Sequence, residues 1–511
     1  MGYVRGFFGG VAADEPKAAL VGRDILSAGG TAADAAVAIY FTMAVTLPSS
    51  ASLGGGGICV VRDSKSKEVQ TLDFLSRVPS AIPPSATRPS AIPGNARGFF
   101  ALHAKYGRLQ WAELIRDAEN SARFGVPISR ALASDMKRME GVLLKEPSLR
   151  KIFGRPDGGG LLGEGDLLVQ LELSGILARI RSRGATDIYT GPIARDLAAA
   201  ANAVGGSLSY EDLRAYRPLW RNTIEVPYQA SLMFHFTTPP GWSGLDAAKM
   251  TAMLGYDNLY EETGSDEKDH LIAEVFGRAL RDGPGRGLAQ SGGQINPATH
   301  VSEDYIERLL ASYDPQKHVK MTANSNAPMA SPDDTSGASF TVIDREGSVV
   351  ACALSMNNLF GTGRVTSDSG IVLSALPGRG GRGPNGLSAM LLASKKGFAS
   401  YYASAASGGI VSPASMVSVA ARAVMGTPDD LETAVGRKRV YYQLDQDITY
   451  YEAGLDPSVL SALTQRGHKT RETPVLGYVN AVLCAEGIPS PVMLCSVKTD
   501  RRGYGLSATA D

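Results

Sequence analysis

The spacing of apolar and polar positions predicts a chain that is rich in helices up to about residue 320 and rich in strands beyond it. Apolar residues recur at intervals of three and four, which is typical of helices with one buried face. This spacing predicts helices over 15–29, 96–106, 110–123, 129–142, 166–183, 192–203, 268–280 and 303–313.

The longest apolar stretch, 32–48, contains Asp34, Thr42 and Thr46. It is too short and too interrupted to cross a membrane, so a buried helix is predicted there. No continuous apolar segment with a small-residue cleavage site is found at the N-terminus, and no signal peptide is predicted.

Runs of β-branched and apolar residues predict strands between these helices and in the last third of the chain. The predicted strands are 58–62, 69–74, 223–228, 232–236, 340–343 and 349–354. Residues 79–93 hold five prolines and are predicted to be an extended loop. Residues 320–337 are polar, contain two prolines and lack periodicity, so they are predicted to be a linker.

Composition narrows the possible functions. The chain has 511 residues, enough for one large domain or two to three ordinary ones, with 51 basic and 51 acidic side chains. The balanced charge gives no indication of nucleic acid or of an anionic membrane as a partner. Six histidines show no metal-ligand spacing, so neither a metal nor another cofactor is predicted. The four cysteines have no CxxC spacing and lie mostly in apolar runs, so they are predicted to be reduced thiols in the core.

Hydroxyl-rich residues precede the strand pair at 340–354, in the sequence DDTSGASFTVIDREGSVVACALSMNNLFGTG. A nucleophilic hydroxyl at the start of a strand, with polar groups on the next strand, is the arrangement that N-terminal-nucleophile hydrolases use. The order and spacing resemble the start of the small subunit in the γ-glutamyltransferase (γ-glutamyltranspeptidase) family.

Further blocks that resemble this family occur in order along nearly the whole chain. They are AGGTAADAAVAIYFTMAVTLPSSASLGGGG (28–57), the segment from IPGNARGFF to GVPIS (92–129), LSYEDLRAYRPLWR (208–221), PPGWSGLDAAKM (239–250) and HLIAEVFGRALRD (270–282). The resemblance implies an α+β fold, the four-layer αββα sandwich. It also implies transfer of a γ-glutamyl or related acyl group through an acyl-enzyme, after the precursor is cut to expose the nucleophile.

The resemblance also implies roles for individual residues. Gly408 and Gly409 fall where the family has the two glycines whose backbone N–H groups hold the oxyanion. Asn357 falls where the family binds the donor, and Ser355 replaces a supporting threonine two residues earlier. Ser388 falls on the first of two serines that hold the donor carboxylate, and Ala389 replaces the second.

The nucleophile position departs from the family. Counting back from Asn357 places it at Gly337, which carries no hydroxyl. Thr335 would serve if the alignment shifts by two residues, and Ser336 and Ser339 are the other candidates. The predicted nucleophile is Thr335, which cleavage of the 334–335 bond would expose.

Two contacts to the donor amino acid also differ. Leu75 stands where the family has an arginine that pairs with the α-carboxylate, and Arg77, on the same face of an extended segment, is the predicted substitute. Arg379 stands where an acidic group would hold the α-ammonium. This reversal of charge favours a ligand that is anionic or lacks the ammonium, with Arg379 and Arg382 facing its carboxylate.

The sequence therefore predicts one family-like domain, with a large-subunit-like region at 1–334 and a small-subunit-like region at 335–511. Its predicted function is γ-glutamyl or other acyl-amide hydrolysis or transfer on a small molecule. The alternatives are an uncleaved, inactive homologue that binds or scaffolds, and another acylase on the same scaffold. A cytoplasmic location, no membrane insertion and a possible homodimer or larger assembly complete the expectations.

Overall fold

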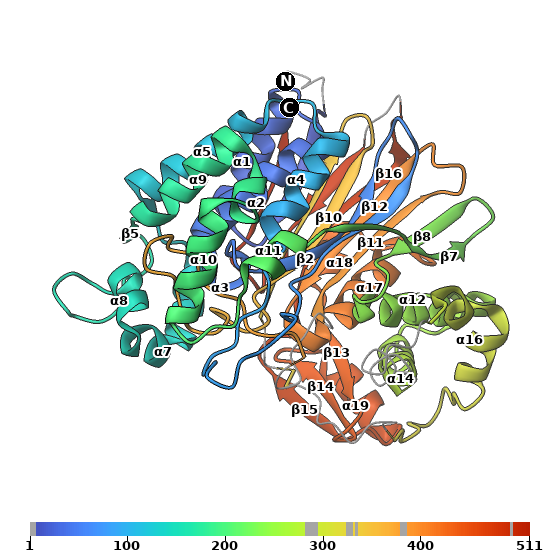
Figure 1. Cartoon of the computed structure of the whole chain (residues 1–511). Helices are drawn as coiled ribbons and strands as arrows, with labels where there is room; N and C mark the ends of the chain where they lie inside the picture. Colours follow the sequence, from blue (N-terminus) through green and yellow to red (C-terminus); the bar gives the residue numbers. More distant parts are fainter. Residues whose placement is uncertain are drawn as a thin grey trace.

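The computed structural model describes residues 7–281, 295–322, 331–332, 336–378, 386–490 and 494–510. Two mostly antiparallel sheets lie face to face at its centre, and helices cover both outer faces (Figure 1). This is the αββα sandwich that the resemblance implied, so the predicted fold class is confirmed.

The first sheet has seven strands, of which four come from residues before 334 and three from residues after it. In spatial order they are β18 (Leu506–Ala510), β1 (Gly9–Ala13), β9 (Ala338–Asp344), β10 (Val349–Ser355), β2 (Gly56–Arg62), β3 (Val69–Phe74) and β6 (Leu219–Asn222).

The second sheet has six strands. Their order is β17 (Cys495–Lys498), β16 (Tyr478–Ile488), β12 (Ser400–Ser407), β11 (Ser388–Ser394), β8 (Leu232–Phe236) and β7 (Ile224–Tyr228). The predicted regions 1–334 and 335–511 thus contribute strands to both sheets. A small third sheet contains β13 (Val440–Gln443), β14 (Ile448–Glu452) and β15 (Thr470–Thr473).

Three apolar layers hold the sandwich together. Side chains such as Val60, Ile343 and Leu391 meet between the two sheets. On the outer face of the seven-stranded sheet, its strands contact α1 (Pro16–Ser27), α2 (Ala32–Thr46) and α4 (Asn95–Tyr106). The same apolar cluster continues outward into α5 (Trp111–Phe124), α9 (Leu171–Arg183) and α10 (Pro192–Ala203). On the outer face of the six-stranded sheet, the strands contact α12 (Trp242–Gly255) and α17 (Ser412–Val424), and α14 (Lys268–Arg281) packs behind α12.

The helix α2 confirms the interpretation of the longest apolar stretch, because all fifteen of its residues are buried. Thr31 and Asp34 form a capping box at its start, which satisfies two backbone N–H groups that a helix leaves unpaired. In the part of the chain that the structure describes, every helix is too short or too polar to span a bilayer.

Some predicted boundaries are wrong. The helix expected over 166–183 begins at Leu171, because β5 (Leu167–Leu168) pairs with β4 (Val126–Pro127). The helix expected over 129–142 is divided into α6 (Arg130–Arg138) and α7 (Glu140–Lys145). The remaining short helices are α3 (Pro48–Ala51), α8 (Pro147–Phe153), α11 (Tyr210–Ala215), α13 (Leu259–Glu262), α16 (Glu303–Leu310), α18 (Leu431–Gly436) and α19 (Pro457–Gln465).

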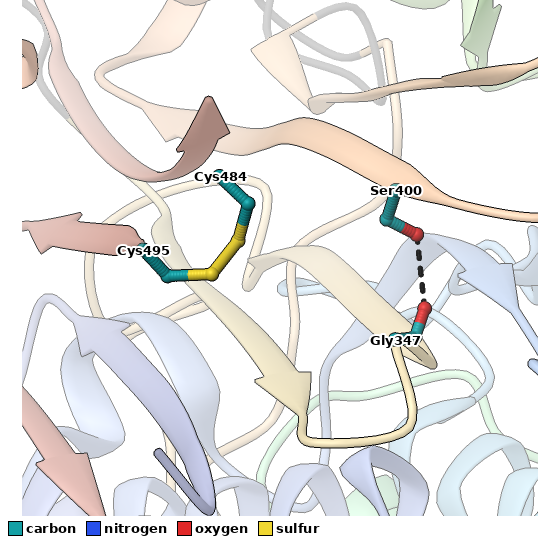
Figure 2. The surroundings of a disulfide bond; sticks show 4 residues. All are labelled: Gly347, Ser400, Cys484 and Cys495. Carbon is teal, nitrogen blue, oxygen red and sulfur yellow. Dashed lines mark hydrogen bonds between the residues drawn. A yellow bond between two sulfur atoms is a disulfide. The ribbon is translucent and has the colours of Figure 1, made fainter. Parts of the chain in front are cut away.

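The prediction of reduced cysteines is also wrong. Cys59 on β2 faces Cys352 on β10, and the two form a disulfide. Cys484 on β16 forms the second with Cys495 on β17, close to the hydrogen bond from Ser400 Oγ to the Gly347 carbonyl (Figure 2). Antiparallel pairing creates both contacts, and sequence spacing does not reveal strand pairing. The cytoplasmic location rested partly on reduced thiols and stays a prediction.

His235 on β8 leads to a prediction about acid stability. Burial, and secondarily the charge of Arg62, lower the pKa of His235 to about 4. The unfolded chain therefore binds a proton at His235 below about pH 6.5, whereas the folded protein binds it only below about pH 4. Between these pH values protonation favours the unfolded chain, so the free energy of unfolding decreases as the pH falls. Between pH 7 and pH 5, this effect lowers the free energy of unfolding of the unmodified protein by about 2 kcal/mol. We expect the decrease to be smaller by that amount in His235→Gln.

Urea unfolding at the two pH values measures this difference. His300→Gln is the matched control, since His300 lies outside both sheets, beside Tyr305. An unchanged pH dependence in His235→Gln would contradict the prediction.

Candidate functional site

The candidate site lies at one end of the sandwich, where the ends of several strands meet. The register places the end of β1, the start of β9, the end of β10 and the start of β2 at this end of the first sheet. The end of β12 lies beside the starts of β11 and β16 in the second sheet. Residues from both predicted regions therefore line one edge.

The two glycines of the predicted oxyanion hole lie at the strand entrance. The N–H groups of Gly408 and Gly409 both donate to the carbonyl oxygen of Ser336, over 3.2 and 3.1 Å. Two backbone donors that converge on one oxygen form the geometry that stabilises the oxyanion of acyl transfer. Their positive φ angles, +114° and +69°, explain why glycine occupies both positions.

Gly337 follows the carbonyl that fills this hole. Its φ is +100°, and a Cβ added there would lie 3.2 Å from the Leu354 carbonyl oxygen. The residue that the count from Asn357 marks as the nucleophile position thus has a backbone conformation that β-branched residues rarely adopt.

We expect Gly337→Ala to lower the free energy of unfolding by about 1–2 kcal/mol, because an L residue pays this cost in the left-handed region. Urea unfolding measures the loss. Gly141→Ala is a suitable comparison, since a Cβ at Gly141 meets nothing within 4 Å. Equal stability of Gly337→Ala and the unmodified protein would show that the strand entrance is free to change conformation.

The other proposed hydroxyls differ in their surroundings. Thr335 lies outside the residues that the structure describes. Ser336 is partly exposed at the entrance of β9. Ser339 is fully buried, its hydroxyl is hydrogen-bonded to Asp14 and Asn480, and it does not line the cavity beside the strand entrance that is described below. It is therefore a poor candidate for attack on a bound ligand.

Asn357 links three segments at the edge. Its side-chain amide donates to Ser76 Oγ over 3.1 Å and to the Ala375 carbonyl over 2.8 Å. Its backbone N–H donates to Ser355 Oγ over 2.8 Å, and its φ is +62°. Asn357 and Ser355 are therefore in direct contact, and their hydrogen bonds stabilise the local conformation of the chain.

Arg77, the predicted substitute for the family's arginine, follows Ser76, which Asn357 contacts. Arg77 Nη2 lies 2.7 Å from Asp73 Oδ2, and Arg221 Nε lies 3.0 Å from the same oxygen. Two guanidinium groups share one carboxylate, so the three side chains together carry one net positive charge. Arg379 lies outside the described residues, so its predicted contact stays a prediction.

Ser388 begins β11 and is completely buried. Among the described residues, no hydrogen-bond partner is found for its hydroxyl. An unpaired buried hydroxyl costs about 1–3 kcal/mol, so a ligand or a water that pairs with Ser388 is favoured.

A cavity of about 340 Å³ opens beside the strand entrance. Gly337, Ser407 and Asp14 line it, together with Tyr478 and Tyr504. A larger hollow of about 1020 Å³ lies over α1 and α5, but Gly337 does not line it. The smaller cavity is therefore the space that a ligand near the two glycines would use.

Sequence reasoning missed the polar network that joins the cavity to the core. The carboxylate of Asp14 accepts hydrogen bonds from Ser339, Ser407 and Asn480. Burial raises the pKa of Asp14 above its ordinary value, although these hydrogen bonds oppose the shift. The contact with Ser407 spans 393 positions, so no local signal in the sequence could have found it.

A histidine cluster lies away from this site. The ligand atoms of His270, Glu274 and His468 lie within 4.8 Å of one another, an arrangement that could hold a metal ion. Here His270 and His468 are hydrogen-bonded to each other at 2.8 Å, and Glu274 is paired with His318 at 2.5 Å. The spacing of His270 and Glu274, one helical turn apart, is the signal that sequence reasoning passed over. The expected absence of a metal stays a prediction.

Comparison with known proteins assigns the chain to a family. The family profile described as gamma-glutamyltranspeptidase matches residues 18–375. The glutathione hydrolase proenzyme of Bacillus subtilis (strain 168) is 28% identical over 93% of this chain and 87% of its own length. Scoloptoxin SSD14 of Scolopendra dehaani is 26% identical over 91% of this chain and 87% of its own length.

Solved structures share the architecture. Cephalosporin acylase from Bacillus halodurans superposes with a TM-score of 0.82 at 20% identity, over 98% of this chain and 96% of that one. The γ-glutamyltranspeptidase of Helicobacter pylori has a TM-score of 0.55 at 26% identity, over 62% of this chain and 95% of that one. The family match supports an acyl-transfer or hydrolase activity, whereas the likeness to cephalosporin acylase shows the shared fold. The chain belongs to the γ-glutamyltranspeptidase family.

Proposed function

We propose that the chain hydrolyses or transfers the acyl group of γ-glutamyl or related acyl amides, with a donor specificity that differs from that of its relatives. The observation that carries this proposal is the convergence of the Gly408 and Gly409 N–H groups on one carbonyl oxygen. A substrate carbonyl that displaced Ser336 would meet the same two donors. Removing one such donor typically costs about 10²–10³ in rate.

The charges near the site support a small anionic donor that lacks an α-ammonium group. The Arg77, Asp73 and Arg221 group carries one net positive charge, and Ser388 offers a buried hydroxyl. Ser374 and Ala375, a few residues before Arg379, offer a hydroxyl and a backbone carbonyl rather than a carboxylate, and both accept hydrogen bonds from the amide of Asn357. Arg379 is proposed to add a further positive charge.

The nucleophile of this proposal is Thr335, exposed by cleavage of the 334–335 bond. Once it is the first residue, its own α-amine serves as the base, as in other N-terminal-nucleophile enzymes. The proposal requires the entrance of β9 to shift, because the Ser336 carbonyl now occupies the hole.

A second function is favoured by a specific observation. The carbonyl held by the two glycines precedes Gly337, so the peptide bond placed for attack is followed by a residue without a hydroxyl. An uncut, non-catalytic homologue that binds the same ligands or scaffolds a partner would have this arrangement.

Release of the chromophore from a series of acyl anilides, with and without an α-amino group, separates the two functions. Turnover of anilides with an anionic acyl group supports the first. No turnover of any anilide, together with an intact chain after long incubation, leaves the non-catalytic function.

Self-cleavage has a consequence for gel analysis, because the disulfide between Cys59 and Cys352 links 1–334 to 335–511. We expect a cleaved sample to run as one band without reductant and as two fragments with it. N-terminal sequencing of the smaller fragment should start at Thr335. Two fragments without reductant would show that this disulfide is absent, and one intact band under both conditions would show that the chain is uncut.

A further inference from the structure

Ser407 is the last residue of β12 and directly precedes the two glycines. Its hydroxyl donates to Asp14 Oδ2 over 2.7 Å. Only 1% of the residue is exposed, yet it lines the cavity beside the strand entrance. Residues 407–409 thus combine a hydroxyl with two oxyanion donors. The neighbouring Asp14 supplies a carboxylate that can accept the proton of the hydroxyl.

Asp14 follows the end of β1 and lines the same cavity. Its position is fixed by the backbone N–H of Ser339 at 2.7 Å and by the amide of Asn480 at 2.6 Å. The burial that raises its pKa makes this carboxylate a better proton acceptor than an exposed one.

Gly337 has no side chain that would cover Ser407. A Cβ added at Gly337 would lie 3.8 Å from the Cβ of Ser407, so the two positions are direct neighbours. Gly337 and Ser407 both line the cavity beside the strand entrance.

We propose that Ser407 is a nucleophile and Asp14 its general base, in place of an N-terminal residue. This inference rests on the proposed acyl-transfer function and assigns it a different reacting group. Ser407 Oγ forms a bond to the substrate carbonyl carbon while its proton passes to Asp14. The carbon–nitrogen bond then breaks, and Asp14 returns the proton to the leaving amine. A water molecule then gives a proton to Asp14 and forms a bond to the acyl carbon. The bond between that carbon and Ser407 Oγ breaks, and the proton passes from Asp14 to Ser407, so the acid is released and no other reactant is needed.

Treatment of the full-length protein with phenylmethanesulfonyl fluoride tests the assignment without a known substrate. A sulfonyl adduct on Ser407, located by peptide mass spectrometry, is the expected result. Asp14→Asn should slow its formation about 100- to 10,000-fold, the usual contribution of a general base. Ser407→Cys provides an independent test. The thiol at position 407 should be alkylated by iodoacetamide faster than the thiol of a Ser404→Cys variant, which lies in the core.

Turnover separates this inference from the proposed function. On the best anilide, Ser407→Ala should lose at least about 1,000-fold in kcat/KM with its folding unchanged. Loss in Thr335→Ala but not in Ser407→Ala would overturn the inference and leave the proposed function in place. Absence of an adduct on Ser407 in the folded protein would also overturn it, whether or not the protein turns over any anilide.

Discussion

Replacing Arg439 with leucine is expected to lower the free energy of unfolding by about 3–5 kcal/mol, the usual cost of breaking a buried ion pair from one side. Arg439 and Asp500 are both about 1% exposed, and their charged groups lie 2.6 Å apart. Leucine would leave the Asp500 carboxylate buried with Arg502 as its remaining ionic partner, 3.0 Å away.

The loss would extend to the candidate site. Arg439 Nη1 donates to the carbonyl oxygens of Leu476 and Gly477, and Asp500 accepts from the N–H of Val479. Gly477 lies against Gly408, since a Cβ on Gly408 would come within 2.6 Å of its Cα. The ion pair therefore supports the segment against which the oxyanion loop packs, and we expect activity to fall together with stability.

Urea unfolding at pH 7 measures the change. Arg437→Leu is the matched control, because Arg437 is largely exposed and pairs with Asp429 at the surface, where an ion pair contributes about 1 kcal/mol or less. The double variant Arg439→Leu, Asp500→Leu should recover part of the loss, since no uncompensated carboxylate remains. A loss below about 1 kcal/mol in Arg439→Leu would contradict the prediction.

Local signals in the sequence predicted most of the sandwich. The strands expected at 340–343 and 349–354 are β9 and β10, and the long apolar stretch is the buried helix α2. Periodicity of two or 3.6 residues depends on which face of an element is buried, so it can be read from a short window. The count from Asn357 gave Gly337 as the nucleophile position, and Gly337 directly precedes β9. The count could succeed because β9 and β10 are adjacent in the sequence and pair with each other.

Contacts between distant segments could not be predicted in the same way. The disulfide between Cys59 and Cys352 spans 293 positions, and the hydrogen bond between Asp14 and Ser407 spans 393. Each depends on the register or stacking of strands, which no single window of sequence contains. The resemblance predicted the two oxyanion glycines, but Ser407 was found only through its contact with Asp14 and its place in the cavity.

Gly408→Ala is expected to reduce kcat/KM about 10²- to 10³-fold on the anilide that the unmodified protein cleaves best, the range seen when one oxyanion donor is lost. Gly408 has a φ of +114°, and its added Cβ would collide with Gly477. The backbone must rotate or move away from Gly477, and either change turns the N–H away from the oxygen that it now shares with Gly409. The loss should fall on kcat more than on KM, because an oxyanion forms only in the reaction.

Gly436→Ala is the matched control for this variant. Gly436 ends α18, and a Cβ there meets nothing within 4 Å. Its activity should equal that of the unmodified protein, while thermal unfolding reports whether Gly408→Ala is folded. A folded Gly408→Ala protein that keeps activity within about threefold, a difference below 1 kcal/mol, would remove the glycine pair from the mechanism and with it the basis for an acyl-transfer site at this edge.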